Sequence, residues 1–256
     1  TSVSMDPIEK KPLYHFHPGS TILSMGTIGC NFHCDFCQNW SISQSDDHRA
    51  TEEITPERAI QICHRYDSYG VCYTYNEPFI WYEFVLDTAQ LARAAGLKNV
   101  LVTNGYVNEA PLRELLPYVD AMNIDVKAMS TEFYRELCRG RPEPPRRTAE
   151  IARQQGCCVE ITNLVIPNWN DREEDIQVLV DWVATLGTDV PLHFSRYHPD
   201  YKLAEPPTPP ETLFRARALA QQKLSYVYIG NLWGVKGENT ICPGCGKVVV
   251  ERHGFT

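Results

Sequence analysis

Three cysteines lie close together in the first part of the chain, with the spacing C-x3-C-x2-C. They are Cys30, Cys34 and Cys37, in the stretch "GCNFHCDFCQNW". Three thiols at this spacing are neither a disulfide pair nor a complete four-ligand site. Thiolates are the usual ligands of iron–sulfur clusters, and short cysteine spacings let one loop surround one cluster. Three thiolates on a four-iron cube leave one iron open to a small molecule, and the spacing favours this interpretation.

Two other interpretations of this loop stay open. A zinc site would need a fourth ligand, for which His33 lies inside the loop and His48 lies farther along the chain. A fully ligated cluster would need a remote cysteine, and the protein would then be a non-catalytic iron–sulfur or zinc protein. In the cluster interpretation, the rings of Phe32 and Phe36 would shield the metal from water.

A second cysteine pair, Cys242 and Cys245 in "CPGCG", is half of a zinc-knuckle pattern. Two thiolates do not close a tetrahedral site, so zinc binding here would need ligands from elsewhere. The other cysteines lie in apolar or helical contexts, where a free cysteine behaves as a small buried hydrophobic residue. These are Cys63, Cys72, Cys138, Cys157 and Cys158. This distribution predicts an intracellular, reducing compartment, the cytoplasm.

The composition limits the partners of the chain. A formal charge of −8 and a pI near 5.5 argue against nucleic acid and anionic membranes, which basic patches recognise. No apolar run approaches the roughly 18 residues that would span a bilayer. The chain begins with a polar stretch that lacks an initiator Met. We therefore expect it to be part of a longer protein.

Short apolar runs alternate with amphipathic patterns after residue 20, as strands and helices do in α/β proteins. Strands are predicted at 21–29, 70–77, 99–105, 121–128, 158–167, 191–199 and 226–232. Helices are predicted at 55–66, 79–96, 109–118, 147–156, 171–187 and 211–222. This alternation predicts a parallel sheet with right-handed crossovers. Six or seven such units, with no glycine-rich fingerprint after the first strand, favour a partial or complete barrel over a flat sheet.

The predicted barrel also indicates where the cysteine loop lies. The loop follows the first predicted strand, at the carboxyl edge where barrel enzymes carry out their chemistry. We expect an N-terminal extension at 1–20, the barrel at 21–233 and a small cysteine-bearing appendage at 234–256.

The stretch "CNFHCDFC" resembles the CxxxCxxC signature of the radical S-adenosylmethionine (SAM) enzymes, with the aromatic Phe36 before the last cysteine. The resemblance extends over essentially the whole chain. It is closest to the radical SAM member of the AmmeMemoRadiSam system, which is related to pyruvate formate-lyase activating enzyme. The stretches that carry it are "LYHFHPGS", "CQNWSISQ", "YTYNEPFIWYEF", "VTNGY", "NIDVKA", "LVIPNWND", "HFSRYHPDYK" and "GENTICPGCG".

The resemblance implies a TIM-barrel-like fold, a partial (β/α)6 barrel with a small C-terminal appendage, and a [4Fe–4S] cluster on Cys30, Cys34 and Cys37. It implies that the open iron binds SAM, and that one electron cleaves SAM to methionine and a 5′-deoxyadenosyl radical. This radical would abstract hydrogen from a substrate that the sequence does not identify. An electron donor such as flavodoxin or ferredoxin is implied. A partner protein that receives a glycyl radical is an alternative substrate.

The resemblance also assigns SAM contacts at two strand ends. In "YNEP", Glu77 holds the place of an acid that binds the methionyl amine, and Asn76 replaces a glycine of the relatives. In "NIDVKA", Asp125 would bind the ribose hydroxyls and Lys127 the methionyl carboxylate. The simpler interpretations are a helix-start acid for Glu77 and a structural ion pair for Asp125 and Lys127. No catalytic residue beyond the cluster and SAM ligands can be assigned.

Further contacts are implied at the ends of other predicted strands. Asn104, in "TNG", would line the methionine end of SAM, and Val165, in "VIPNWND", the adenine end. His198 matches a histidine that the relatives place near the ribose. His193 on the same strand is a weaker candidate, since a histidine in a strand is commonly a hydrogen-bonded structural residue.

Overall fold

The computed structural model describes residues 2–45, 53–232, 234 and 237–255. In this part of the chain an eight-stranded sheet follows the order of the sequence. Its first strand pairs antiparallel to the second, and all later pairs are parallel. The strands are β1 (Ser2–Pro7), β2 (Thr21–Gly26), β3 (Gly70–Tyr73), β4 (Lys98–Thr103), β5 (Ala121–Asp125), β6 (Cys158–Val165), β7 (Leu192–Arg196) and β8 (Val227–Gly230).

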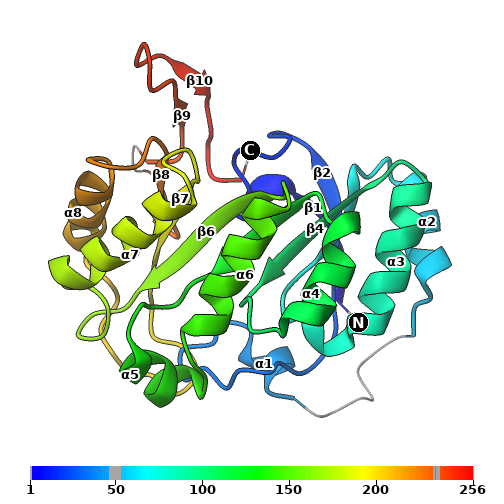
Figure 1. Ribbon diagram of the computed structural model, residues 1–256, viewed down its shortest axis with the longest axis horizontal. Helices are drawn as coiled ribbons and strands as arrows, with labels where there is room; N and C mark the ends of the chain where they lie inside the picture. Colours follow the sequence, from blue (N-terminus) through cyan, green and yellow to red (C-terminus); the bar gives the residue numbers. More distant parts are fainter. Residues whose placement is uncertain (1, 46–52, 233, 235–236, 256) are drawn as a thin grey trace.

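Among these residues no ladder joins β8 to β1, so the sheet forms an open barrel. Helices cover one face of it (Figure 1). They are α2 (Pro56–Arg65), α3 (Tyr82–Ala94), α4 (Glu109–Leu115), α6 (Glu143–Gln154), α7 (Glu173–Leu186) and α8 (Pro210–Ala220). This arrangement confirms the predicted α/β fold class. No helix in the described ranges is long and apolar enough to cross a membrane.

The helix boundaries follow local chemistry. Thr55 caps α2, because its side chain accepts a hydrogen bond from the backbone N–H of Arg58. The predicted helix 79–96 begins instead with a 3-10 turn, η3 (Pro78–Trp81), before α3. Helix α6 begins earlier than predicted, because prolines near its start occupy the first turn, where no N–H donor is needed.

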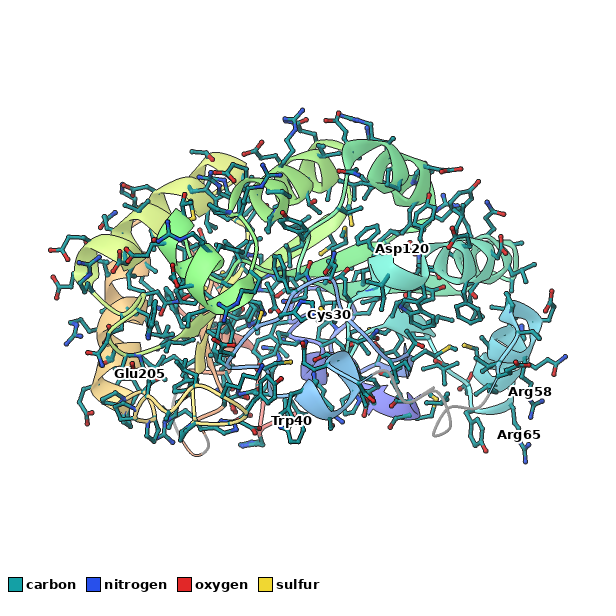
Figure 2. The ribbon with its side chains drawn as sticks, turned by 90° about the horizontal axis from the view of Figure 1, so that it is seen from below. Cys30, Trp40, Arg58, Arg65, Asp120 and Glu205 are labelled. Atoms are coloured by element: carbon teal, nitrogen blue, oxygen red, sulfur yellow. The ribbon has the colours of Figure 1, made fainter. Side chains whose placement is uncertain are left out.

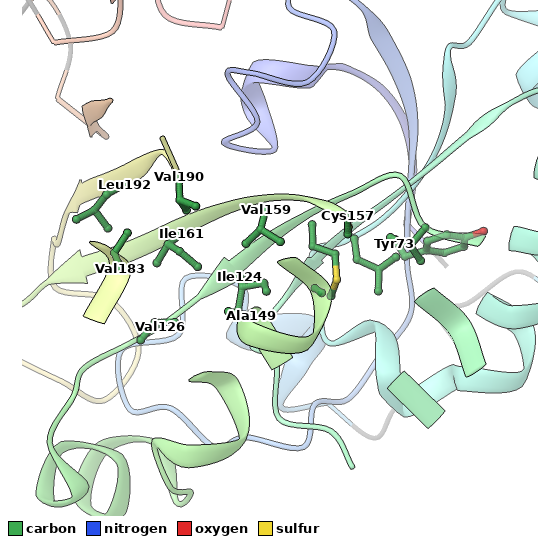
Figure 3. Close-up of a cluster of buried hydrophobic side chains, with 14 of the residues drawn as sticks. Tyr73, Ile124, Val126, Ala149, Cys157, Val159, Ile161, Val183, Val190 and Leu192 are labelled. Atoms are coloured by element: carbon green, nitrogen blue, oxygen red, sulfur yellow. The ribbon is translucent and has the colours of Figure 1, made fainter. Parts of the chain in front are cut away.

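The main core lies between the sheet and these helices. Figure 3 shows it: Ile124, Val159 and Ile161 of the strands point toward Ala149 of α6 and Val183 of α7. Alternate residues of each strand point to the inner face of the open barrel. The segment after β1 covers part of that face. It includes the 3-10 turn η1 (Ile8–Lys10), and Ile8, Leu13 and Phe16 pack there against Ile22 of β2 and residues of the neighbouring strands.

The two ends of the sheet carry different structures. At the carboxyl end lie α1 (Trp40–Ser43), α5 (Thr131–Phe133) and the π-helical turn η5 (Tyr134–Cys138) (Figure 1). At the other end the hairpin of β9 (Thr240–Ile241) and β10 (Val248–Val250) projects from the body. The tail beyond the barrel, predicted as an appendage, therefore contains a small hairpin. A last 3-10 turn, η4 (Leu116–Tyr118), extends α4.

Candidate active site at the carboxyl end of the sheet

The cysteine loop leaves β2 at the carboxyl end of the sheet, as predicted. In the view onto this end, Cys30 lies near the centre (Figure 2). Cys34 is buried, whereas Cys30 and Cys37 are half-buried. The backbone N–H of Gly29 donates to the carbonyl of Ile42 at 2.9 Å, which closes the base of the loop against α1.

Aromatic rings enclose the loop. The Phe32 ring packs 4.8 Å from that of Tyr106, and the Phe36 ring lies 5.7 Å from that of Phe133 (centroid distances). Phe32 and Phe36 are 1% and 3% exposed, so both rings are removed from water. The predicted shielding of the loop by these two phenylalanines is consistent with this packing.

Hydrogen-bond donors point at the sulfur atoms of the loop. The backbone N–H of Phe32 donates to Cys30 Sγ at 3.4 Å, and Asn104 Nδ2 lies 3.7 Å from the same sulfur. Cys37 Sγ is 3.1 Å from the hydroxyl of Ser43. Burial raises the pKa of Cys30 to about 12, so a bound cation must stabilise its thiolate. Three thiols of one loop, with donors aimed at sulfur, are the kind of donor set that an iron–sulfur cluster needs.

The zinc interpretation has less support in this geometry. Within the described ranges, no three His, Cys, Asp or Glu side chains converge as ligands of a single metal ion. His33 is exposed, and His48 lies outside the described residues. The described residues therefore offer no ligand set for a single zinc ion at this loop.

Glu77 lies beside this loop in a pocket of donors. It is 2% exposed, and its carboxylate accepts hydrogen bonds from Thr103 Oγ1 at 2.7 Å, Asn104 N at 2.8 Å and Phe79 N at 3.1 Å. Burial raises the pKa of Glu77 to about 7, although these three donors oppose the rise. Because Asn104 also contacts the Cys30 sulfur, it connects the acid to the cysteine loop.

Asn76 has a structural task that the sequence did not indicate. Its Oδ1 accepts from the backbone N–H of Thr27, and its Nδ2 donates to the carbonyl of Gly29, both at 3.0 Å. The side chain thus bridges the backbone on which β2 leads into Cys30. A glycine at this position would leave both backbone groups without this partner.

Asp125 and Lys127 form the ion pair that the simpler interpretation of these two residues predicted. Lys127 Nζ lies 2.6 Å from Asp125 Oδ2 at the end of β5. Burial alone would lower the pKa of Lys127, but the Asp125 carboxylate and the Cys34 thiol raise it well above its usual range. Asp125 also raises the pKa of Glu77, so the two acids belong to one site.

Two residues that the sequence analysis missed hold the backbone of Lys127. The hydroxyl of Tyr134 accepts from its N–H at 3.0 Å, and Asn170 Nδ2 donates to its carbonyl at 2.8 Å. Asn170 also donates to the carbonyl of Leu164 at 3.0 Å, and its Oδ1 accepts from the N–H of Ile166. The signal available for Asn170 was an asparagine in the loop after a strand, and the more economical interpretation of that position was an N-cap for the following helix.

The remaining predicted residues lie in different places. His198 is exposed beside the cysteine loop, where its Nδ1 is 3.4 Å from Gln38 Nε2. The side chain of Val165 points into the main core, and its carbonyl accepts from Thr208 Oγ1 at 2.6 Å. His193 is near the start of β7, buried with its Nε2 at 2.6 Å from Glu160 Oε2. The structure thus brings His198 to the site, but not the Val165 side chain or His193.

Cys242 and Cys245 lie in the hairpin at the opposite end of the sheet. Backbone N–H groups of Cys245 and Gly244 lower the pKa of Cys242, as in loops that present a thiolate. The structure brings no third ligand to this pair within the described residues. Zinc binding by this pair stays a prediction.

Comparison with known proteins places the chain in a family. It belongs to the radical SAM superfamily, whose family model matches residues 25–182. An uncharacterized protein of Methanocaldococcus jannaschii is 49% identical over 258 residues, which cover 99% of this chain and 77% of that protein. Pyruvate formate-lyase 1-activating enzyme of Escherichia coli K12 is 24% identical over 215 residues, covering 76% of this chain and 86% of the enzyme.

Solved structures share the fold. SuiB of Streptococcus suis, in a crystal structure bound to S-adenosylmethionine, has a TM-score of 0.65 at 15% identity. The match covers 82% of this chain and 52% of SuiB, so the chain spans about half the length of that protein. QueE of Escherichia coli has a TM-score of 0.57 at 16% identity, with 89% of this chain and 91% of QueE covered. Superfamily membership implies a [4Fe–4S] cluster and SAM as cofactors.

Proposed function

We propose that this protein binds a [4Fe–4S] cluster through Cys30, Cys34 and Cys37 and uses it with SAM in radical catalysis. When bound, these two cofactors supply reductive cleavage of SAM to methionine and a 5′-deoxyadenosyl radical, which abstracts a hydrogen atom from a substrate. The task of the chain is to bind and orient these cofactors and the substrate, and to exclude water from them. Its buried loop and enclosing aromatic rings fit that task.

The side chains at the mouth would each bind one part of SAM. The Glu77 carboxylate would accept from the methionyl amine, and the Lys127 ammonium would pair with the methionyl carboxylate. Asp125 would bind the ribose hydroxyls, with His198 nearby. Asn104 would lie at the methionine end, and Val165 would contribute only backbone at the adenine end. We also propose Phe36 as a cofactor contact, through its ring beside the last two cysteines.

One observation carries this proposal: Glu77 and the Asp125–Lys127 ion pair both lie beside the cysteine loop. Asn104 connects Glu77 to the Cys30 sulfur through its backbone N–H and its side chain. On the other side, Lys127 and Asp125 lie close enough to Cys34 to shift the pKa of its thiol. A set of opposite charges around buried thiols at the mouth of a barrel suits a zwitterionic ligand such as the methionyl group of SAM.

A more specific assignment within the superfamily is also proposed. The likeness to pyruvate formate-lyase 1-activating enzyme favours hydrogen abstraction from a glycine of a partner protein as a second candidate function. The motifs quoted above favour the AmmeMemoRadiSam system, in which the substrate would be a different molecule. Deuterium transfer into 5′-deoxyadenosine from labelled candidate proteins and small molecules distinguishes these two assignments.

The proposal is tested by anaerobic reconstitution with iron and sulfide, followed by dithionite and SAM. Dithionite stands in for the electron donor, for which we propose flavodoxin or ferredoxin. We expect 5′-deoxyadenosine from the unaltered chain and none from Cys34→Ala, while Cys158→Ala, a cysteine outside the loop, keeps the activity. Lys127→Ala should retain iron but bind SAM more weakly. A reduced cluster that binds SAM without forming 5′-deoxyadenosine contradicts the catalytic assignment.

A further inference from the structure

A fourth thiol lies beside the three of the loop. Cys138, at the end of η5, is 0% exposed and belongs to the same buried cluster as Cys34 and Phe36. The Cys138 side chain lies close enough to the Cys34 thiol to raise its pKa, and burial raises this pKa further. The two residues are far apart in the sequence, so nothing in the C-x3-C-x2-C pattern indicates this contact.

Backbone hydrogen bonds fix this pair of thiols. The N–H of His33 donates to the carbonyl of Cys138 at 3.1 Å, and the N–H of Asp35 donates to the carbonyl of Leu137 at 2.9 Å. These two bonds lie on either side of Cys34 in the sequence. An ion pair between Arg139 Nη2 and Asp35 Oδ2, at 3.1 Å, joins the same two segments nearer the surface. The two segments therefore hold the thiols together by their main chains.

The surroundings would favour a hydrogen bond between these two thiols and set its direction. The rings of Phe36, Phe133 and Tyr134 belong to the same buried cluster, so such a bond would lie in a region of low dielectric, where a hydrogen bond is stronger than in water. A cysteine that ligates iron is a thiolate and has no S–H to donate. With Cys34 as ligand, Cys138 would therefore be the donor and the Cys34 sulfur the acceptor.

We propose that Cys138 is a positioning residue that donates its S–H to the Cys34 ligand sulfur and thereby raises the reduction potential of the cluster. The inference rests on the proposed function. One-electron reduction adds negative charge to a cluster and its thiolates, and a donor to sulfur stabilises the more negative state. Hydrogen bonds to sulfur are among the factors that set cluster potentials. If Cys138 were only a core residue, its removal would not change the reduction potential. If Cys138 were an iron ligand, its removal would reduce iron binding.

The test compares Cys138→Ala, Cys138→Val and Cys138→Ser with the unaltered chain after anaerobic reconstitution. Cys157→Ala, at another buried cysteine, is the control. Iron and sulfide per chain are measured first, and then the midpoint potential by EPR-monitored redox titration without SAM. We expect unchanged iron, a more negative potential in both the Ala and the Val variant, and recovery toward the original value in Cys138→Ser, whose hydroxyl can donate.

Each other outcome has a defined meaning. An unchanged potential in the Ala and Val variants overturns the inference, as does a shift in only one of them, which would reflect packing. Loss of iron from all three variants would make Cys138 a ligand and overturns it too. An unaltered chain that binds no cluster refutes the proposed function itself, whereas the results above leave that function intact.

Discussion

At the scale of single residues, the site contains an acid that burial keeps protonated to unusually high pH. Glu77 is surrounded by three donors, yet its pKa rises from 4.5 to about 7. The three hydrogen bonds alone therefore do not offset the free-energy cost of removing the ionised carboxylate from water. A positively charged ligand would offset that cost, since an ammonium group favours the ionised carboxylate. This is the physical reason to place the SAM amine at Glu77.

The raised pKa of Glu77 predicts a pH dependence of stability in the apoprotein. The folded chain holds the Glu77 proton to higher pH than the unfolded chain, so this residue lowers stability as pH rises from 4.5 to about 7. We expect Glu77→Gln to gain stability relative to the unaltered chain across this window, by up to about 3 kcal/mol. Urea unfolding at several pH values measures the difference, and parallel curves for the two proteins would contradict the prediction.

At the scale of elements, short apolar runs predicted the parallel strands, because these strands are buried on both faces. Amphipathic patterns predicted the helices, because each helix buries one face against the sheet. The strands are shorter than predicted, since β3 ends at Tyr73 and β5 at Asp125, and the following residues turn into the loops of the site. The contact between Asp125 and Lys127 was predictable from spacing, because two residues two apart point the same way. The contact between Cys34 and Cys138 was not, because only tertiary structure brings their loops together.

The elements around the cysteine loop fit closely at one glycine. A Cβ atom at Gly140 would lie 2.4 Å from Cε1 of Phe32, whose ring packs against Tyr106 and Tyr134. Gly140→Ala should therefore displace Phe32 and its loop, cost about 1–3 kcal/mol of stability, and reduce iron retained after reconstitution.

Two further variants check the cause of this effect. Phe32→Leu combined with Gly140→Ala should recover part of the loss, because the smaller side chain removes the clash. Gly244→Ala, where the Cβ would lie 3.9 Å from the nearest atom outside its chain neighbours, should leave iron retention unchanged. Equal iron retention in Gly140→Ala and the unaltered chain would refute the close fit.

At the scale of the whole molecule, both ends of the chain are tied to the barrel. The sequence suggested an extension at 1–20 and an appendage at 234–256, because neither continues the alternating pattern. Within the predicted extension, β1 adds a strand to the sheet, because β2 offers a free edge that a short polar strand can pair. We keep 21–233 as the proposed catalytic unit, with the two ends as structural parts of it.

A single arginine joins the two ends inside the molecule. Arg252 is 3% exposed and donates to the carbonyl of Tyr14 at 2.7 Å and to Thr240 Oγ1 at 2.7 Å. Its Nε lies 3.9 Å from Oε1 of Glu9, an acid that is itself 3% exposed. The N-terminal segment and the hairpin thus meet in one buried network, which no local pattern of the sequence could indicate.

Removing this arginine should destabilise the barrel. Arg252→Met leaves the buried Glu9 charge without its cation, and we expect a loss of about 3–5 kcal/mol in the free energy of unfolding, measured with urea. Adding Glu9→Gln should restore part of the loss, since the unpaired charge is then gone. Arg215→Met, at an exposed arginine of α8, should change stability by less than about 0.5 kcal/mol. If Arg252→Met resembles the Arg215 control, the ends of the chain do not stabilise the barrel.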